Sequence, residues 1–250
     1  MTTFPGAIDQ MLTAQTAAGK PPAFMLAGHN GSGKSTMWYD RLAPTLQIPL
    51  VNADRMMMSI LPDPGRKGLP TWAQELRDTD EDWMAVAQRG VDAFVLNAMA
   101  QKVSFATETV FSHWKPLADG TFESKIDRIR EMQAAGYFVV LLFVGLADVG
   151  LSIGRVATRV SRGGHAVANE KLIARFPRTQ TAVRHAIAIA DAAMLVDNSR
   201  TEDEAFTVCR VQMGAQCLYD VRDSGDSPSV VRAWLDVVAP LQEASANNPA

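Results

Sequence analysis

Short apolar runs alternate with amphipathic stretches along the chain, and this alternation predicts strands separated by helices. The run at 137–146 is continuous and rich in Val, Leu and Phe, as is typical of a parallel strand that is buried on both faces. Further strands are expected at 23–27, 48–52, 103–111 and 192–196, and a strand pair within 205–220. The order of elements predicts an α/β protein with a mostly parallel sheet covered on both faces.

Helical spacing of apolar residues separates these strands. We expect helices at 7–18, 35–42, 71–102, 122–135, 149–161, 169–191 and 228–242. Pro44 is expected to follow the second of them, and Gly136 to close the fourth. Residues 61–70 hold three prolines and two glycines and predict a mobile loop. The candidate core positions of the long stretch at 71–102 are Trp72, Leu76, Trp83, Val86, Phe94 and Leu96.

Composition limits the class of protein. The 250 residues suit a single domain over 1–250, with a core at about 20–200 and a C-terminal extension, 201–250, that packs on it. A net charge of −3 without a basic tract disfavours nucleic acid as a partner. The longest apolar run is too short to cross a bilayer, and the first residues lack a secretion signal, so we expect a cytoplasmic protein without membrane contact. Cys209 and Cys217 are expected to be buried or half-buried reduced thiols.

The segment after the first strand has the spacing G-x-x-x-x-G-K-[ST]. Its glycines let backbone N–H groups turn toward an anion, and the next helix directs its positive end at the phosphates. Lys34 can bridge the β- and γ-phosphates, and the Ser35 hydroxyl can reach Mg²⁺. We therefore expect ATP and Mg²⁺ to bind here. The predicted ATP-binding residues are Gly28, His29, Asn30, Gly31, Ser32, Gly33, Lys34, Ser35 and Thr36.

A carboxylate follows the second strand. Asp54 stands in the sequence NADRM, where the carboxyl end of a parallel strand faces the ligand crevice. From there it can accept the proton of an acceptor hydroxyl as the phosphoryl group transfers. The alternative is an aspartate that only caps the next helix.

The third strand carries a second acid, Glu108, among apolar and hydroxyl residues, so its burial requires a partner. It can hold a sugar hydroxyl or a water bound to Mg²⁺, and Thr109 beside it can hydrogen-bond a polar acceptor. The alternative is an ion pair with an arginine of the core.

Arginines are grouped in the second half of the chain. Arg155, Arg159 and Arg162 share one helix face by their spacing, and Arg175 and Arg178 follow on the next helix. Gly163 and Gly164 form a hinge-like turn between the two helices. The arrangement predicts a helical lid whose arginines neutralise transferring phosphate. The alternative is a solvated basic face.

Together these segments resemble the zeta toxin family of P-loop kinases. The resemblance rests on GHNGSGKST, NADRM, FATETVFS, the block RVATRVSRGGHAVANEKLIARFPRT and a strand that ends in Asp-Asn-Ser, ADAAMLVDNS. It implies a three-layer α/β/α fold with a helical lid. It also implies a kinase that phosphorylates the 3′-hydroxyl of the amino sugar of UDP-N-acetylglucosamine and blocks cell-wall precursor synthesis.

The resemblance assigns roles to residues of this chain. It implies Asp54 as the base, Lys34 and Ser35 at the phosphates and Mg²⁺, and Glu108 near the sugar. Arg159 and Arg175 would neutralise the transferring phosphate, with Arg155 as a rival for the first place. It also implies an antitoxin protein that covers the ATP site. Alternatives are a kinase of another UDP-sugar, metabolite or antibiotic, or a regulatory module that only binds nucleotide.

Overall fold

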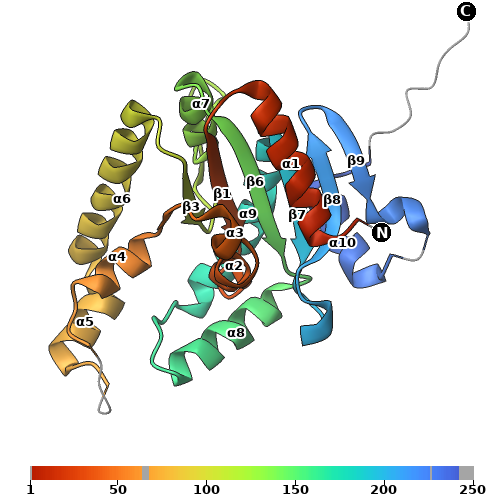
Figure 1. Ribbon diagram of the computed structural model, residues 1–250. Coiled ribbons are helices and arrows are strands. Elements are labelled where there is room, and N and C mark those ends of the chain that lie inside the picture. Colours follow the sequence, from red (N-terminus) through yellow and green to blue (C-terminus); the bar gives the residue numbers. More distant parts are fainter. Residues whose placement is uncertain (1, 64–67, 226, 242–250) are drawn as a thin grey trace, which may run out of the picture.

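The fold is built around a twisted sheet with helices on both faces (Figure 1). The computed structural model describes residues 2–63, 68–225 and 227–241. The strand order is β2-β3-β1-β6-β7-β8-β9; the first five strands are parallel, and β8 and β9 are antiparallel. The predicted mostly parallel sheet is therefore confirmed. The strands are β1 (Pro22–Gly28), β2 (Leu50–Val51), β3 (Phe105–Thr109), β6 (Phe138–Gly145), β7 (Ala192–Asp197), β8 (Thr207–Met213) and β9 (Gln216–Asp220).

Two apolar layers explain why the central strands lack polar alternation. On β1, Met25 packs toward a core that includes residues of α6, α7, α9 and α10, while Phe24 and Leu26 face a second core that includes α1 and the helical segment after the phosphate loop. Side chains of a strand alternate between faces, so a strand covered on both sides must be apolar throughout. The helices are α1 (Phe4–Ala18), α2 (Lys34–Met37), α3 (Ala43–Leu46), α4 (Ala53–Ser59), α5 (Thr71–Thr79), α6 (Glu81–Gln101), α7 (Ile126–Ala134), α8 (Val149–Ser161), α9 (Asn169–Ile187) and α10 (Ser229–Val238).

The stretch 71–102 is two helices rather than one. Asp80 interrupts the helix, and its carboxylate accepts a hydrogen bond from the backbone N–H of Trp83, so it caps the start of α6. The break changes which side chains face inward: Trp72, Val86 and Leu96 are exposed, so their predicted core positions are wrong. Residues 64–67 of the predicted mobile loop lie outside the described residues.

A small hairpin replaces the start of the helix predicted at 122–135. β4 (Trp114–Pro116) pairs antiparallel with β5 (Phe122–Ser124), and α7 begins only at Ile126. The ring of Trp114 stacks on Phe122 and on His185 of α9, with centroids 4.6 and 4.8 Å apart. Helical spacing alone does not show the pairing across this hairpin.

Other boundaries also differ from the predictions: α1 begins at Phe4, β2 covers only Leu50–Val51, and α10 ends at Val238. The helical segment after the phosphate loop continues past Pro44 through a π-helical turn, Trp38–Leu42, because Pro44 falls in the first turn of α3, where its missing N–H costs nothing. The strand predicted at 103–111 is shorter, and the helix predicted at 169–191 ends at Ile187.

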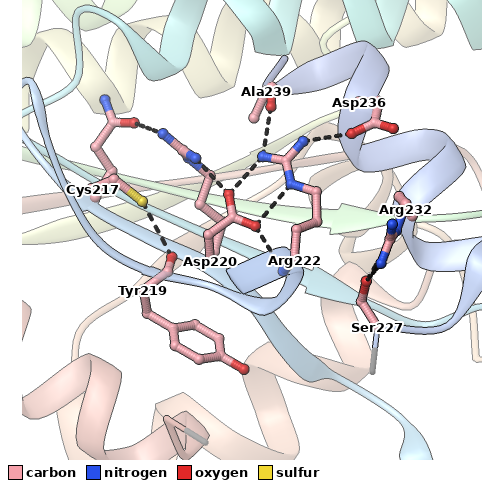
Figure 2. Close-up of polar contacts among 10 residues, drawn as sticks. Cys217, Tyr219, Asp220, Arg222, Ser227, Arg232, Asp236 and Ala239 are labelled. Carbon is pink, nitrogen blue, oxygen red and sulfur yellow. Dashed lines mark hydrogen bonds and ion pairs between the residues drawn. The ribbon is translucent and has the colours of Figure 1, made fainter. Parts of the chain in front are cut away.

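The C-terminal helix α10 is fastened to the strand pair by a network of charges (Figure 2). The buried Arg222 guanidinium donates to both oxygens of Asp220, to Asp236 at 2.6 Å and to the carbonyl of Ala239 at 2.8 Å. Arg210 pairs with Asp220 from the other side. Each charge is paired, as burial requires.

The two cysteines differ in exposure. Cys209 is buried and Cys217 is exposed, and both are free thiols. The prediction of a buried or half-buried thiol is therefore wrong for Cys217, which lies on the edge strand β9. No helix in the described part of the chain is long and apolar enough to cross a membrane.

Candidate active site

The loop between β1 and α2 has a backbone that only glycine can adopt without strain. Gly31 and Gly33 have φ angles of 70° and 93°. A Cβ at Gly33 would lie 2.6 Å from the side-chain nitrogen of Asn198, and one at Gly28 would lie 2.7 Å from the carbonyl oxygen of Val144. The predicted phosphate loop therefore lies tightly against the ends of β6 and β7, at the carboxyl edge of the sheet.

Lys34 lies at the centre of the loop. Its ammonium donates to the carbonyls of Gly28 and His29 at 2.9 and 3.0 Å and lies 3.8 Å from Glu108. Burial lowers the pKa of Lys34, and the charge of Arg159 lowers it further, while Glu108 and Asp54 act in the opposite direction. A bound anion would offset the effect of burial and favour the charged ammonium.

Glu108 joins the phosphate loop to the second strand. One oxygen of its carboxylate accepts hydrogen bonds from the hydroxyl of Ser35 at 2.8 Å and from the side-chain amide of Asn52 at 2.7 Å. The parallel register sets Glu108 opposite Leu26 of β1, two residues before the loop begins. The alternative of an arginine partner is therefore wrong, because the partners are Lys34, Ser35 and Asn52.

Asn52 has a role that the sequence analysis missed. Its Oδ1 accepts from the backbone N–H groups of Asp54 and Arg55 and so caps α4, while its amide donates to Glu108. The cap of this helix is Asn52, which excludes the alternative that Asp54 is the cap. The sequence signals for Asn52 are its place directly after the strand and its residue type, since asparagine often caps the start of a helix.

Asp54 is exposed in the first turn of α4. Burial is the main influence on the pKa of Lys34 and of Arg175 and lowers both, and the negative charge of Asp54 acts in the opposite direction. The neighbouring charge of Arg178 also lowers the pKa of Arg175. Thr109 is half-buried, and its hydroxyl accepts from the N–H of Phe111 at 3.0 Å.

Helix α8 lies along the phosphate loop. Ser152 donates to the carbonyl of Asn30 at 2.7 Å, and a Cβ at Gly31 would lie 3.0 Å from the Cβ of Arg155. Arg159 donates to the carbonyl of His165 at 2.7 Å, while its buried Nε has no hydrogen-bond partner among the described residues. The cavity beside the helix has a volume of about 340 Å³ and is lined by Arg155, Thr158, Arg159, Arg162 and Gly164. Of the predicted arginines, Arg155, Arg159 and Arg162 therefore face this open space, while Arg175 and Arg178 do not line it.

His29 is buried inside the phosphate loop. Its ring stacks on Phe176 of α9 and meets Phe143 of β6 edge-on. Burial and the nearby Lys34 lower its pKa from 6.5 to about 3, so the ring is neutral at physiological pH. Phe176 carried no signal in the sequence, because its contact with the loop joins residues far apart along the chain.

A phosphate-binding loop after the first strand, an acid after the second strand, an acid near the end of the third, and an arginine-bearing helix beside the loop together define a kinase of the P-loop class. The family model described as "Zeta toxin" matches residues 8–222, and the chain belongs to this family.

Individual relatives are distant. A Haemophilus influenzae protein described as uncharacterized is 28% identical over 148 residues, which cover 59% of this chain and 87% of the relative. The AvrRxo1-ORF1:-ORF2 complex with ATP matches with a TM-score of 0.58 and 14% identity, over 96% of this chain and 71% of the other. The PezAT toxin–antitoxin structure from Streptococcus pneumoniae matches with a TM-score of 0.52 and 11% identity, over 94% of this chain and 88% of the other. These structures share the fold.

Proposed function

We propose that the protein transfers the γ-phosphate of ATP to a hydroxyl of a small molecule, and that the acceptor is the 3′-hydroxyl of the amino sugar of UDP-N-acetylglucosamine. One observation carries the proposal: Glu108 contacts Lys34 and Ser35 of the phosphate loop and also Asn52, whose side chain caps the helix of Asp54. This link supports a donor site and an acceptor site at the same edge of the sheet.

The residues fit a magnesium ion. Mg²⁺ prefers oxygen ligands and is usually held in kinases by few protein groups together with substrate phosphates. Ser35 and Glu108 offer a hydroxyl and a carboxylate 2.8 Å apart. No group of three His, Cys, Asp or Glu side chains suited to a metal occurs within the described residues. When bound, the ion would neutralise charge on the phosphates.

Asp54 is the proposed base. The acceptor hydroxyl gives its proton to the Asp54 carboxylate, and its oxygen forms a bond to the γ-phosphorus. The bond between that phosphorus and the bridging oxygen of ADP breaks, and ADP leaves with that electron pair. Asp54 is exposed and therefore accessible to an acceptor that enters from solvent.

We expect three cations to serve the transferring phosphate. They are Lys34 at the start of α2, Arg159 on α8 and Arg175 on α9. Their positive charge would stabilise the negative charge that spreads over the γ-phosphoryl oxygens in the transition state. Arg155 and Thr109 remain for the acceptor and its hydroxyl groups, and Glu108 would contact the acceptor in addition to its proposed role at the magnesium ion.

The family also suggests a biological setting. PezAT is described as a chromosomal toxin–antitoxin system. We propose that this chain acts in the cytoplasm, blocks cell-wall precursor synthesis and is held inactive by an antitoxin protein that covers the ATP site. Nucleic acid and membranes are not among the proposed partners.

The test is a transfer assay with purified protein, γ-labelled ATP and a panel of UDP-sugars, with the product identified by mass. We expect one added phosphate on UDP-N-acetylglucosamine. Asp54→Asn should keep ATP binding and lose transfer by roughly two or more orders of magnitude. The matched control is Asp82→Asn, an exposed aspartate of α6.

The outcomes separate the alternatives. Transfer to another acceptor would show that UDP-N-acetylglucosamine is not the substrate. ATP binding without transfer to any acceptor would indicate a regulatory module. Parental transfer rates in the Asp54→Asn variant would show that Asp54 is not the base.

A further inference from the structure

Arg77 of α5 has an unusual environment for a charged residue. It is only 8% exposed, although α5 lies outside the sheet in the segment between β2 and β3 (Figure 1). Arginine is rarely buried unless its charge and donors are paired. The small apolar cluster near it, Leu61, Leu69 and Ala73, does not supply such partners. The partners of Arg77 must therefore explain its burial.

The partners are an adjacent acid and the turn between α8 and α9. Arg77 donates through Nε and Nη2 to both oxygens of Asp78 at 2.7 Å, and through Nη1 to the carbonyl of Gly163 at 2.6 Å. Asp78 in turn lies 3.2 Å from Nδ1 of His165. Arg77 and Asp78, which we call the clamp, therefore hold the turn at two points.

The same turn carries the hydrogen bond that orients Arg159. The carbonyl of His165 accepts from Nη2 of Arg159 at 2.7 Å, and the N–H of Gly164 donates to the backbone carbonyl of Arg159 at 3.0 Å. A Cβ at Gly164 would lie 2.5 Å from Cγ of Arg159, so the turn packs directly on this side chain. A shift of the turn would therefore move the guanidinium of Arg159.

We propose that Arg77 and Asp78 are positioning residues for phosphoryl transfer, which fasten the turn Gly163–His165 and through it fix the guanidinium of Arg159. The inference rests on the proposed kinase activity and extends it to a second element. Helix α5 and helix α4, which carries the proposed base Asp54, both lie between β2 and β3 in the chain. The clamp therefore connects this part of the chain to the turn after α8 and, through the turn, to Arg159. An arginine held in place before reaction loses less entropy when charge develops on the phosphate.

The kinetic test compares variants in the transfer assay and in ATP hydrolysis without acceptor. Arg77→Ala should lower kcat by roughly tenfold or more with ATP affinity within about twofold, because the clamp acts on the transition state through Arg159. Arg77→Lys should not restore kcat, since an ammonium cannot bond Asp78 and Gly163 in the same fork. Arg89→Ala, an exposed arginine of α6, is the matched control and should leave kcat unchanged.

A double-variant cycle separates positioning from a general structural effect. If Arg77 acts through Arg159, Arg77→Ala should add little to the loss caused by Arg159→Ala. A full multiplicative loss in the double variant, or an unchanged kcat in Arg77→Ala, would overturn the proposal.

A second measurement does not depend on the acceptor. Hydrogen exchange of the Gly163 and Gly164 amides should speed up by about tenfold or more in Arg77→Ala and in Asp78→Asn, which keeps the size of the side chain. Unchanged exchange in both variants overturns the clamp. If the wild-type protein shows neither phosphate transfer nor ATP hydrolysis, the proposed function is overturned instead. The exchange rates alone then show whether Arg77 and Asp78 hold the turn.

Discussion

The imidazole of His29 lies flat on the phenyl ring of Phe176, with ring centroids 3.8 Å apart and planes inclined by 10°. His29 belongs to the phosphate loop, and Phe176 follows Arg175 directly on α9. The stack therefore joins the donor site to the helix that carries one of its arginines. Neither ring nitrogen of His29 has a hydrogen-bond partner among the described residues. The ring acts here as an aromatic surface.

Burial of this imidazole predicts acid sensitivity. The pKa of His29 is about 3 in the folded protein and about 6.5 when the chain is unfolded. Between these values the unfolded chain binds a proton that the folded protein does not, so stability falls as pH decreases from 6.5 toward 3. At pH 5 the contribution to the loss is roughly 2 kcal/mol. His29→Phe should keep the stack and remove this part of the pH dependence, measured by denaturant unfolding at pH 5 and 7.5.

The window between pH 5 and 7.5 keeps the carboxylate of Asp78 out of this measurement. The Arg77 guanidinium lowers the pKa of Asp78, so the stability that this carboxylate contributes is lost only below its usual value of 3.8. The same slope in His29→Phe and the parent between pH 5 and 7.5 would contradict the assignment.

The sequence predicts those parts of the site whose contacts join residues close together in the chain. The phosphate loop, Asp54 and Glu108 follow from local spacing and from the rule that parallel strands end at one edge. The stack of His29 on Phe176 and the contact of Asp78 with His165 join residues far apart in the chain, and no local pattern encodes them. The break at Asp80 was missed because the apolar spacing continues across it, although Asp80 is a typical cap residue.

Lys34→Ala tests the donor side of the site. Removal of the ammonium that contacts the loop carbonyls should weaken ATP binding. It should also reduce turnover by roughly two orders of magnitude, because Lys34 would stabilise the phosphates in the transition state as well as in bound ATP. ATP affinity is measured by calorimetry and turnover by the transfer assay. Unchanged affinity together with full activity would contradict a phosphate-binding loop. The control is Lys20→Ala, at an exposed lysine before β1.

Glu108→Gln tests the magnesium proposal. The amide keeps the size of the side chain but lacks the charge, and one of its two ends can no longer accept from Ser35 or Asn52. We expect the Mg²⁺ concentration for half-maximal transfer to rise by roughly tenfold or more at fixed ATP. Glu131→Gln, at an exposed glutamate of α7, should not change it. A magnesium dependence equal to the parent in Glu108→Gln would leave Glu108 with a role in the acceptor site alone.

Substitutions at Gly145 and Trp234 test how α10 is packed against the sheet. A Cβ at Gly145, the last residue of β6, would lie 2.8 Å from two atoms of the Trp234 ring, which is rigid and buried. Gly145→Ala should therefore destabilise the protein by about 1–3 kcal/mol, because α10 must shift away. Trp234→Leu alone should also destabilise it, since it removes ring contacts with Phe143 and the hydrogen bond to Asp197.

The combination of these two changes is diagnostic. Once the ring of Trp234 is absent, the added methyl group at Gly145 has space, so the double variant should be no less stable than Trp234→Leu alone within about 0.5 kcal/mol. Denaturant unfolding of the four proteins measures this coupling. Gly154→Ala, on the exposed face of α8 where a Cβ meets no atom, should stabilise the protein by about 1 kcal/mol or leave it unchanged. Strict additivity of Gly145→Ala and Trp234→Leu would show that the strain at Gly145 arises elsewhere than against this ring.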